Sequence, residues 1–320
     1  MSNLSNYYGR AYEYAFLLVL KEVVEPYRNI IIEKNSSFIA SQKAWNLINN
    51  NIQSKYLLSA RAGVKLILDL EPLIIEDGKD DLDVMLQPDQ MGKMGDVRDL
   101  LIIRRNIKWE IGLSIKHNHF AVKHSRLSKK NDFGQKWYGV ECSTRYWNEI
   151  APIFDILTDY KKSTMKWSEL STKEDDVYIP LLKAFLNEIR LSYDNYGDVI
   201  PKKMIEYLLG QFDFYKVIGI DNKRLTQVQS YNLRGTLNKP SKKKKPKIII
   251  PIPELPTRII CTEFKPESKN TVEIYMNNGW QLAFRIHNAS TFVESSLKFD
   301  IQLIGMPASI ICIDHKWIDK

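Results

Sequence analysis

Three side chains of this 320-residue sequence have the types and the spacing for metal-assisted hydrolysis of a phosphodiester. Asp99 opens one predicted β-strand, and Ser114 and Lys116 close the next one. A tight turn at Arg105-Asn106 predicts a hairpin, in which the start of the first strand faces the end of the second. A carboxylate can hold Mg²⁺ at a phosphate, and a lysine can orient the attacking water. We therefore predict a catalytic group of Asp99, which also binds the metal, Lys116, and Ser114, which positions a ligand or phosphate.

A second carboxylate is expected, because one aspartate alone binds Mg²⁺ weakly. Side chains alternate along a strand, so Glu110 lies on the face of Ser114 but roughly 13 Å away, too far to share an ion. Glu13, on the first predicted helix, is the preferred second metal ligand, and Asp96 is the next choice. Glu141, just past the hairpin region, is a further alternative that would have to swing back. The competing interpretation of Glu13 is an ordinary solvated helix face.

The elements that must position these residues follow from hydrophobic periodicity. Helical spacing predicts helices over 8–24, 41–58, 147–160, 178–193 and 202–209. Alternation and β-branched runs predict an antiparallel meander over 82–87, 97–103 and 107–116. Five further strands are predicted over 258–264, 272–276, 280–286, 299–304 and 309–313, whereas 64–75 fits either type. This pattern predicts an α/β fold with a mixed central sheet flanked by helices and a smaller β-rich C-terminal portion.

Charge and composition narrow the class of protein. The formal net charge is +8, with nine basic and two acidic residues in 98–130 and six lysines in 239–247. Concentrated positive charge favours a polyanion such as nucleic acid, because neutralising phosphates releases counterions. No apolar run approaches the ~20 residues of a membrane span, and no secretory signal is recognised. Three cysteines far apart in the sequence indicate neither a disulfide framework nor a cysteine zinc site, so a reduced, cytosolic protein is expected.

Longer stretches of the sequence resemble known families. Asp99 followed by Ser114-Ile115-Lys116 resembles the PD-(D/E)xK nucleases, with serine in the place of the second acid. The stretches GDVRDLLIIRRN (95–106) and WEIGLSIKHNHFAVKHSRLS (109–128) closely resemble the HaeIII family of type II restriction endonucleases. The shorter stretches 9–14, 167–171, 231–239 and 285–290 also look like that family. The likeness covers nearly the whole chain, which makes it far more specific than the spacing alone.

The resemblance implies a bacterial, Mg²⁺-dependent site-specific deoxyribonuclease. Such an enzyme hydrolyses double-stranded DNA at GGCC, between G and C, and leaves blunt ends with a 5′-phosphate and a 3′-hydroxyl. A companion cytosine methyltransferase protects the same site without necessary contact with the nuclease, and no membrane partner is implied. A palindromic target favours a homodimer on DNA, with a monomer that cuts the strands in turn as the alternative.

Within that expectation, the chain divides into three parts. Residues 1–238 form a nuclease core with N-terminal helices and a helical middle region, and 239–257 form a basic connection rich in Pro and Lys. Residues 258–320 form a β-rich DNA-binding portion, either separate from the core or fused to it. Two other functions remain open: a structure-selective repair or recombination nuclease, and a non-catalytic DNA-binding module in which Ser114 marks a decayed site.

Reading GGCC requires donors for guanine O6 and N7 and acceptors for the cytosine N4 amino group. The predicted contacts to the scissile phosphate or to nearby bases follow the catalytic strand: His119, Lys123, His124 and Arg126. The predicted base-reading residues lie near turn or strand signals of the C-terminal part: Arg234, Asn238, Arg285, His287 and Asn288. The lysine run 242–245 is expected to contact phosphates, because a flexible ammonium selects charge rather than sequence.

Overall fold

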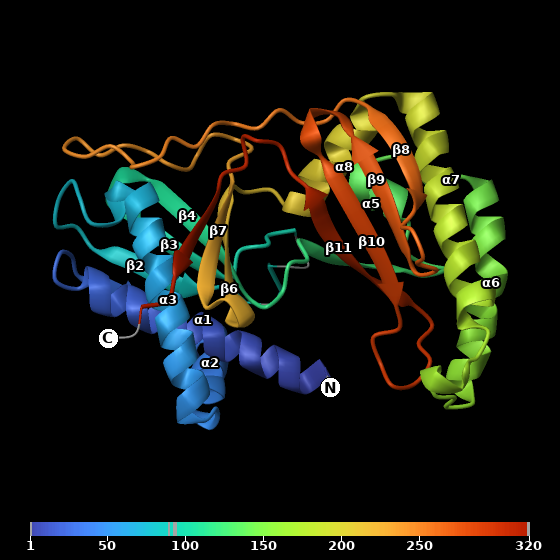
Figure 1. Cartoon of the computed structure of the whole chain (residues 1–320), viewed down its shortest axis with the longest axis horizontal. Helices are drawn as coiled ribbons and strands as arrows, with labels where there is room; N and C mark the ends of the chain where they lie inside the picture. The colour runs from blue at the N-terminus through green and yellow to red at the C-terminus, as the bar shows by residue number, and fades with distance from the viewer. Residues whose placement is uncertain (1, 89, 92–94, 319–320) are drawn as a thin grey trace. The chain divides into compact units, whose positions relative to one another are not determined.

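The computed structural model of the chain describes residues 2–88, 90–91 and 95–318. It contains two compact units, and neither is one continuous stretch of the chain (Figure 1). The first unit comprises residues 1–120, 210–253 and 308–320, and the second comprises 121–209 and 254–307. The boundaries of these units differ from the boundaries predicted from the sequence. The helical middle region belongs with the C-terminal strands, and the last residues return to the first unit.

The first unit is built on a mixed sheet with the strand order β1-β2-β3-β4-β6-β7-β12. Its strands are β1 (Ile30–Ile32), β2 (Leu82–Leu86), β3 (Leu100–Arg104), β4 (Trp109–His117), β6 (Phe214–Ile220), β7 (Leu225–Tyr231) and β12 (Cys312–Lys316). The helices are α1 (Ser2–Val24), α2 (Ser36–Leu47) and α3 (Asn50–Leu70). Strand β4 runs antiparallel to β3 but parallel to β6, which makes the sheet mixed, as predicted.

The predicted meander is confirmed by the register of β2, β3 and β4. Val84 pairs with Ile102, and Ile102 pairs with Ile111. The β3–β4 turn is a short 3₁₀ segment, Arg105–Ile107, that ends at Lys108 in the left-handed conformation, with φ of 50°. Helices α1 and α3 pack on the apolar face of this sheet and form the core with it. The opposite face of β4 is therefore left for polar side chains, because neighbouring residues alternate.

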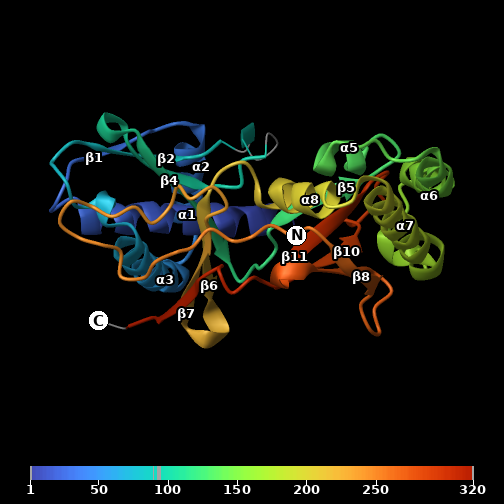
Figure 2. The same cartoon turned by 90° about the horizontal axis from the view of Figure 1, so that it is seen from above.

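The second unit is built on a five-stranded antiparallel sheet with the order β5-β11-β10-β9-β8. Its strands are β5 (Lys123–Leu127), β11 (Leu297–Gly305), β10 (Gln281–His287), β9 (Thr271–Met276) and β8 (Ile259–Phe264). The helices α5 (Phe133–Tyr138), α6 (Thr144–Lys162), α7 (Ile179–Tyr196) and α8 (Val199–Leu209) lie to one side of it (Figure 2). Aromatic contacts join the two layers, for example that of Phe185 with Phe284 and Phe299.

Several element boundaries differ from the prediction for identifiable reasons. The helix predicted over 41–58 is two helices, because the Asn49 side chain caps α3 by accepting from the Ile52 amide at 3.0 Å. The ambiguous segment 64–75 continues α3 and then turns at Pro72. Strands β1, β5, β6 and β7 were not predicted, and β12 lies at 312–316 rather than 309–313. Strand β5 joins the C-terminal strands, so the second sheet is not purely C-terminal.

Cys142, Cys261 and Cys312 are free thiols. Within the described part of the chain, no helix combines the length and the apolar character needed to cross a bilayer.

Candidate active site

Asp99, Ser114 and Lys116 converge at one end of the mixed sheet, as the hairpin predicts. Oδ2 of Asp99 accepts a hydrogen bond from Nζ of Lys116 at 2.7 Å and from the Ile115 amide at 2.7 Å. The Ser114 hydroxyl donates to the same oxygen at 3.3 Å. Leu100 pairs with Leu113, so the preceding Asp99 lies beside Ser114 on the polar face of the sheet. Oδ2 of Asp99 therefore accepts hydrogen bonds from both of the other predicted residues, Ser114 and Lys116.

The Lys116 ammonium is held in its charged form by its neighbours. Burial alone would lower the pKa of Lys116, but the charge and hydrogen bond of Asp99, with the charge of Glu13, outweigh it and raise the pKa. The lysine is therefore a cation at neutral pH. In that state it balances the negative charges of Asp99 and Glu13, and its ammonium donates hydrogen bonds.

Glu13 is the acid whose charge reaches this group. It lies half-buried on α1, and its carboxylate contributes to the raised pKa of Lys116. Carboxylate and hydroxyl oxygens are the hard ligands that a divalent ion such as Mg²⁺ prefers. Asp99, Glu13 and Ser114 offer oxygen donors of that kind.

Asp96 is engaged in a structural ion pair. The Arg98 guanidinium bonds its carboxylate through Nε at 2.8 Å and Nη2 at 2.8 Å, and Gln87 donates to it at 2.8 Å. Burial would raise the pKa of Asp96, but these bonds keep the pKa below its ordinary value. Its lone pairs are therefore committed to Arg98 and Gln87, and this geometry does not favour the predicted metal role of Asp96.

Arg98 also occupies the space above Gly112 on the polar face. A Cβ at Gly112 would come within 2.0 Å of Cδ of Arg98, so glycine is required there. The guanidinium pairs with Glu110 at 2.6 Å and lies 4.0 Å from the centre of the Phe212 ring. These residues line a pocket of about 410 Å³ in the first unit, and exposed Arg234 lies at its edge. Glu110 is thereby committed to Arg98, which agrees with its exclusion as a metal ligand.

Lys216 is a residue of this site that the sequence did not reveal. It lies on β6 directly beside Ser114, is 2% exposed, and donates to the Phe120 carbonyl at 2.5 Å. Burial, with repulsion from Lys116, lowers its pKa to about 7 against the attraction of Asp99. The signal that was overlooked is a lysine inside the apolar run FYKVIGI (214–220), where an ammonium has no structural reason to be.

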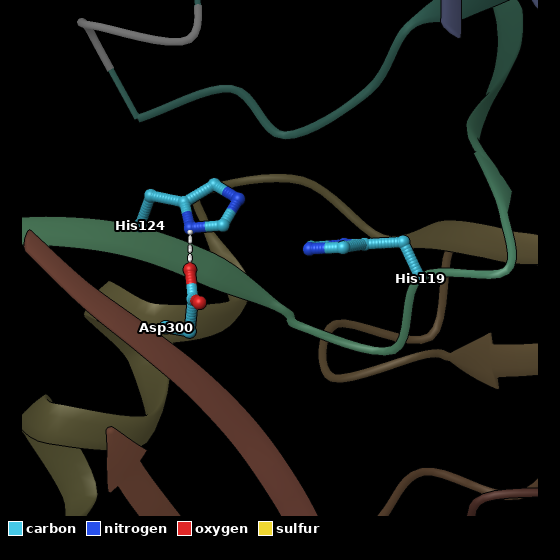
Figure 3. Close-up of side chains that lie close together, drawn as sticks. All are labelled: His119, His124 and Asp300. Atoms are coloured by element: carbon cyan, nitrogen blue, oxygen red, sulfur yellow. Dashed lines mark ion pairs between the residues drawn. The ribbon is translucent and has the colours of Figure 1, made fainter. Parts of the chain in front are cut away.

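In the second unit, His124, Arg285 and His287 gather around Asp300. Nδ1 of His124 lies 2.8 Å from Oδ1 of Asp300 (Figure 3), and Nη2 of Arg285 lies 2.7 Å from Oδ2. His287 approaches the same carboxylate at 3.6 Å. Three of the predicted DNA-contacting residues therefore share one acidic partner that was not predicted.

The other two predicted residues of β5 lie on opposite faces of that strand. Arg126 is exposed and donates to Glu294 at 2.8 Å and to Ser296 at 2.9 Å. Lys123 points the other way, onto α8, where its ammonium lies 3.6 Å from the centre of the Tyr207 ring. Burial lowers the pKa of Lys123 to about 8. Arg126 is thus an exposed cation of β5, whereas Lys123 packs within the second unit.

The two predicted asparagines use their amides within the protein. Asn238 donates to the Leu70 carbonyl at 2.9 Å and accepts from the Ile250 amide at 3.0 Å. Asn288 bonds three backbone groups of the loop 290–294. Their side chains therefore hold loops in place, which does not favour the predicted base reading. His119 is exposed on the loop that follows β4 (Figure 3). Glu141 is exposed in the second unit.

Comparisons with known proteins bear on the whole chain. The family model described as HaeIII restriction endonuclease matches residues 9–307. The chain is 58% identical over 317 residues to "Type II restriction enzyme HaeIII" of Haemophilus aegyptius, and the alignment covers 99% of each protein. No solved structure matches the chain. The similarity thus extends over both compact units.

Proposed function

The chain belongs to the HaeIII restriction endonuclease family and is a type II restriction endonuclease acting on double-stranded DNA, and we propose that it cuts at GGCC between G and C. The products are blunt ends with a 5′-phosphate and a 3′-hydroxyl. The observation that carries the chemistry is the meeting of the Lys116 ammonium with the Asp99 carboxylate at 2.7 Å. This pair, a carboxylate immediately before β3 and a lysine on the neighbouring strand β4 of a mixed sheet, supports a PD-(D/E)xK-type core.

Asp99 and Glu13 would hold the divalent ion that this family typically uses, which we take to be Mg²⁺. The ion supplies charge neutralisation at the phosphate and a more acidic water. Lys116 orients the attacking water and offers its protons to the phosphate oxygens. The Ser114 hydroxyl, 3.3 Å from Oδ2 of Asp99, fixes the orientation of that carboxylate.

Each unit offers groups suited to contact DNA. Arg126 and Arg234 are exposed cations suited to phosphates, and His124, Arg285 and His287 form the base-reading group. The lysine run 242–245 adds contacts that depend on salt concentration but not on sequence. Because GGCC is palindromic, we propose a homodimer on DNA, in a bacterial cytoplasm where a companion cytosine methyltransferase protects the host sites.

Cleavage mapping tests the proposed specificity. With Mg²⁺, the protein is expected to convert a plasmid with mapped GGCC sites into discrete fragments whose ends ligate as blunt ends. A plasmid methylated at the GGCC cytosines is the matched control and should stay intact. Cutting confined to junctions or flaps would instead indicate a repair or recombination nuclease, and a shifted but intact plasmid would indicate a non-catalytic binding protein.

Replacement of Glu13 tests the second metal ligand. Glu13→Gln is expected to slow GGCC cleavage about 100-fold or more, because a carboxamide binds Mg²⁺ weakly, while raising the Mg²⁺ concentration needed for half-maximal rate. Glu22→Gln, an exposed glutamate of the same helix paired with Arg61, is the control and should cut normally. If Glu13→Gln cuts at the wild-type rate and with the wild-type Mg²⁺ requirement, Glu13 is not a metal ligand.

A further inference from the structure

The pocket of about 410 Å³ beside Arg98 is a cavity of the first unit that the chemical step does not use. Its wall includes Glu110, which precedes Ser114 by four residues on the same face of β4, so the pocket lies roughly 13 Å from the catalytic group. The segment before β6 and the loop after β7 supply the other walls. Four basic and two acidic side chains line this space, which is large enough for a small ligand group.

Both acids of the pocket already have partners. Glu110 accepts from Nη1 of Arg98 at 2.6 Å. Asp213 is buried and accepts from the backbone amides of Arg234 at 2.9 Å and Thr236 at 2.8 Å, and the Thr236 hydroxyl donates to it at 2.8 Å. These bonds to Asp213 hold the loop that carries Arg234 in one conformation. The positive side chains therefore determine which ligand the pocket attracts.

Three of those positive side chains have no acidic partner. Lys108, Arg234 and Lys239 are exposed, and within the part of the chain that the structure describes no carboxylate oxygen lies within 4.0 Å of their side-chain nitrogens. Other exposed lysines do form ion pairs, for example Lys129 with Asp155. Like charges repel one another, so three unpaired cations around one cavity favour binding of an anion.

The buried lining adds further donors and an apolar surface. Three of the five N–H groups of Arg98 bond Asp96 and Glu110, so two remain. The guanidinium lies 4.0 Å from the centre of the Phe212 ring, which is 44% exposed. Trp109 is 7% exposed, and its indole N–H has no hydrogen-bond partner among the described residues. A phosphate with its deoxyribose matches this lining, because it brings anionic oxygens for the donors and a sugar for the aromatic ring.

We propose that this pocket is a phosphate subsite, in which Arg234, Lys108, Lys239 and Arg98 hold a phosphate of the DNA strand other than the one that is cut. This inference rests on the proposed function and deepens it. The distance of roughly 13 Å from Ser114 corresponds to at most about four nucleotides, because successive phosphates of one strand rise by about 3.4 Å. Such a contact fixes the affinity and the register of the duplex and reads no base.

Neutralising one phosphate at a time tests the subsite. A methylphosphonate removes the charge of a single phosphate, and a set of GGCC duplexes carries one such group at each of the four phosphates on either side of the cut. Binding is measured by fluorescence anisotropy with Ca²⁺ in place of Mg²⁺. For the wild-type protein, we expect Kd to rise about 10-fold at one or two of these positions. Arg234→Gln should raise Kd for the unmodified duplex by a similar factor and show no further loss at those positions.

Matched variants separate a subsite from a general effect of charge. Lys239→Gln should behave like Arg234→Gln, and each should lower the slope of log Kd against log salt concentration by about 1. Lys65→Gln removes an exposed lysine of α3, which packs on the opposite face of the sheet, and should keep the wild-type loss at every position. Cleavage of unmodified GGCC DNA by the wild-type protein tests the proposed function alone.

Two results would overturn the inference. The first is an equal loss in the wild-type protein and in Arg234→Gln at every phosphate position, because the pocket would then hold none of these phosphates. The second is inhibition of binding by inorganic phosphate that disappears in Arg234→Gln without coupling to any DNA phosphate. That result would assign the pocket to a free anion.

Discussion

Asp99→Ala and Lys116→Ala are each expected to lower the rate of GGCC cleavage by about 1,000-fold or more. Asp99→Ala removes a proposed metal ligand together with the acceptor that holds Lys116 at 2.7 Å. Lys116→Ala removes the cation that orients water and balances charge at the phosphate. Both side chains lie at the surface of the site, 22% and 30% exposed, so the fold should survive. Single-turnover cleavage with excess enzyme measures the chemical step directly.

The two residues should behave as one unit. The double variant is expected to be no slower than either single variant, because each alone already disables the same assembly. Specific binding to GGCC, measured with Ca²⁺, should persist in all three proteins. Asp83→Ala is the matched control, since Asp83 lies on neighbouring β2 and pairs with the exposed Arg105. Multiplicative losses in the double variant, or normal cutting by either single variant, would contradict the shared role.

The catalytic pair could be predicted because its geometry is local. Asp99 lies immediately before β3 and Lys116 lies on β4, and a short turn joins the two strands, so the register follows from the turn and the hydrophobic pattern alone. The same reasoning could not reveal the ion pair of Asp96, because nothing in the sequence shows that Arg98 folds back onto it. Spacing identifies residues that are able to meet, but competition for a carboxylate is decided by packing.

The parts that the sequence did not reveal depend on contacts between distant segments. Lys216 reaches the site through a parallel pairing of β4 with β6, and β6 is buried along its whole length, so it shows no alternation. Asp300 on β11 lies between β10 and β5, and β5 comes from a distant part of the chain. The division into units escaped prediction for the same reason, since β5 pairs with β11 and β12 pairs with β7.

Lys216→Met is expected to stabilise the protein, by roughly 3 kcal/mol at pH 6 in the absence of divalent ions. The pKa of Lys216 falls from 10.5 to about 7 on folding, so at pH 6 both states are protonated and the folded state carries a buried cation. Relief of that cost, about 4–5 kcal/mol, is partly offset by loss of the hydrogen bond to Phe120, about 1 kcal/mol. Urea unfolding of both proteins gives the difference.

The pH dependence identifies the cause of this stabilisation. Between pH 7 and pH 10.5 the unfolded chain binds more protons than the folded one. The free energy of unfolding of the wild-type protein therefore rises with pH. Over the same range, the stability advantage of Lys216→Met shrinks toward zero. Lys223→Met, at an exposed lysine of the same unit, should change the free energy of unfolding by less than about 0.5 kcal/mol at any pH. A gain that stays constant from pH 6 to pH 10 would instead reflect better apolar packing of methionine. Because Lys216 lies beside Ser114, retention of so costly a cation is what a catalytic site, rather than a core, would select.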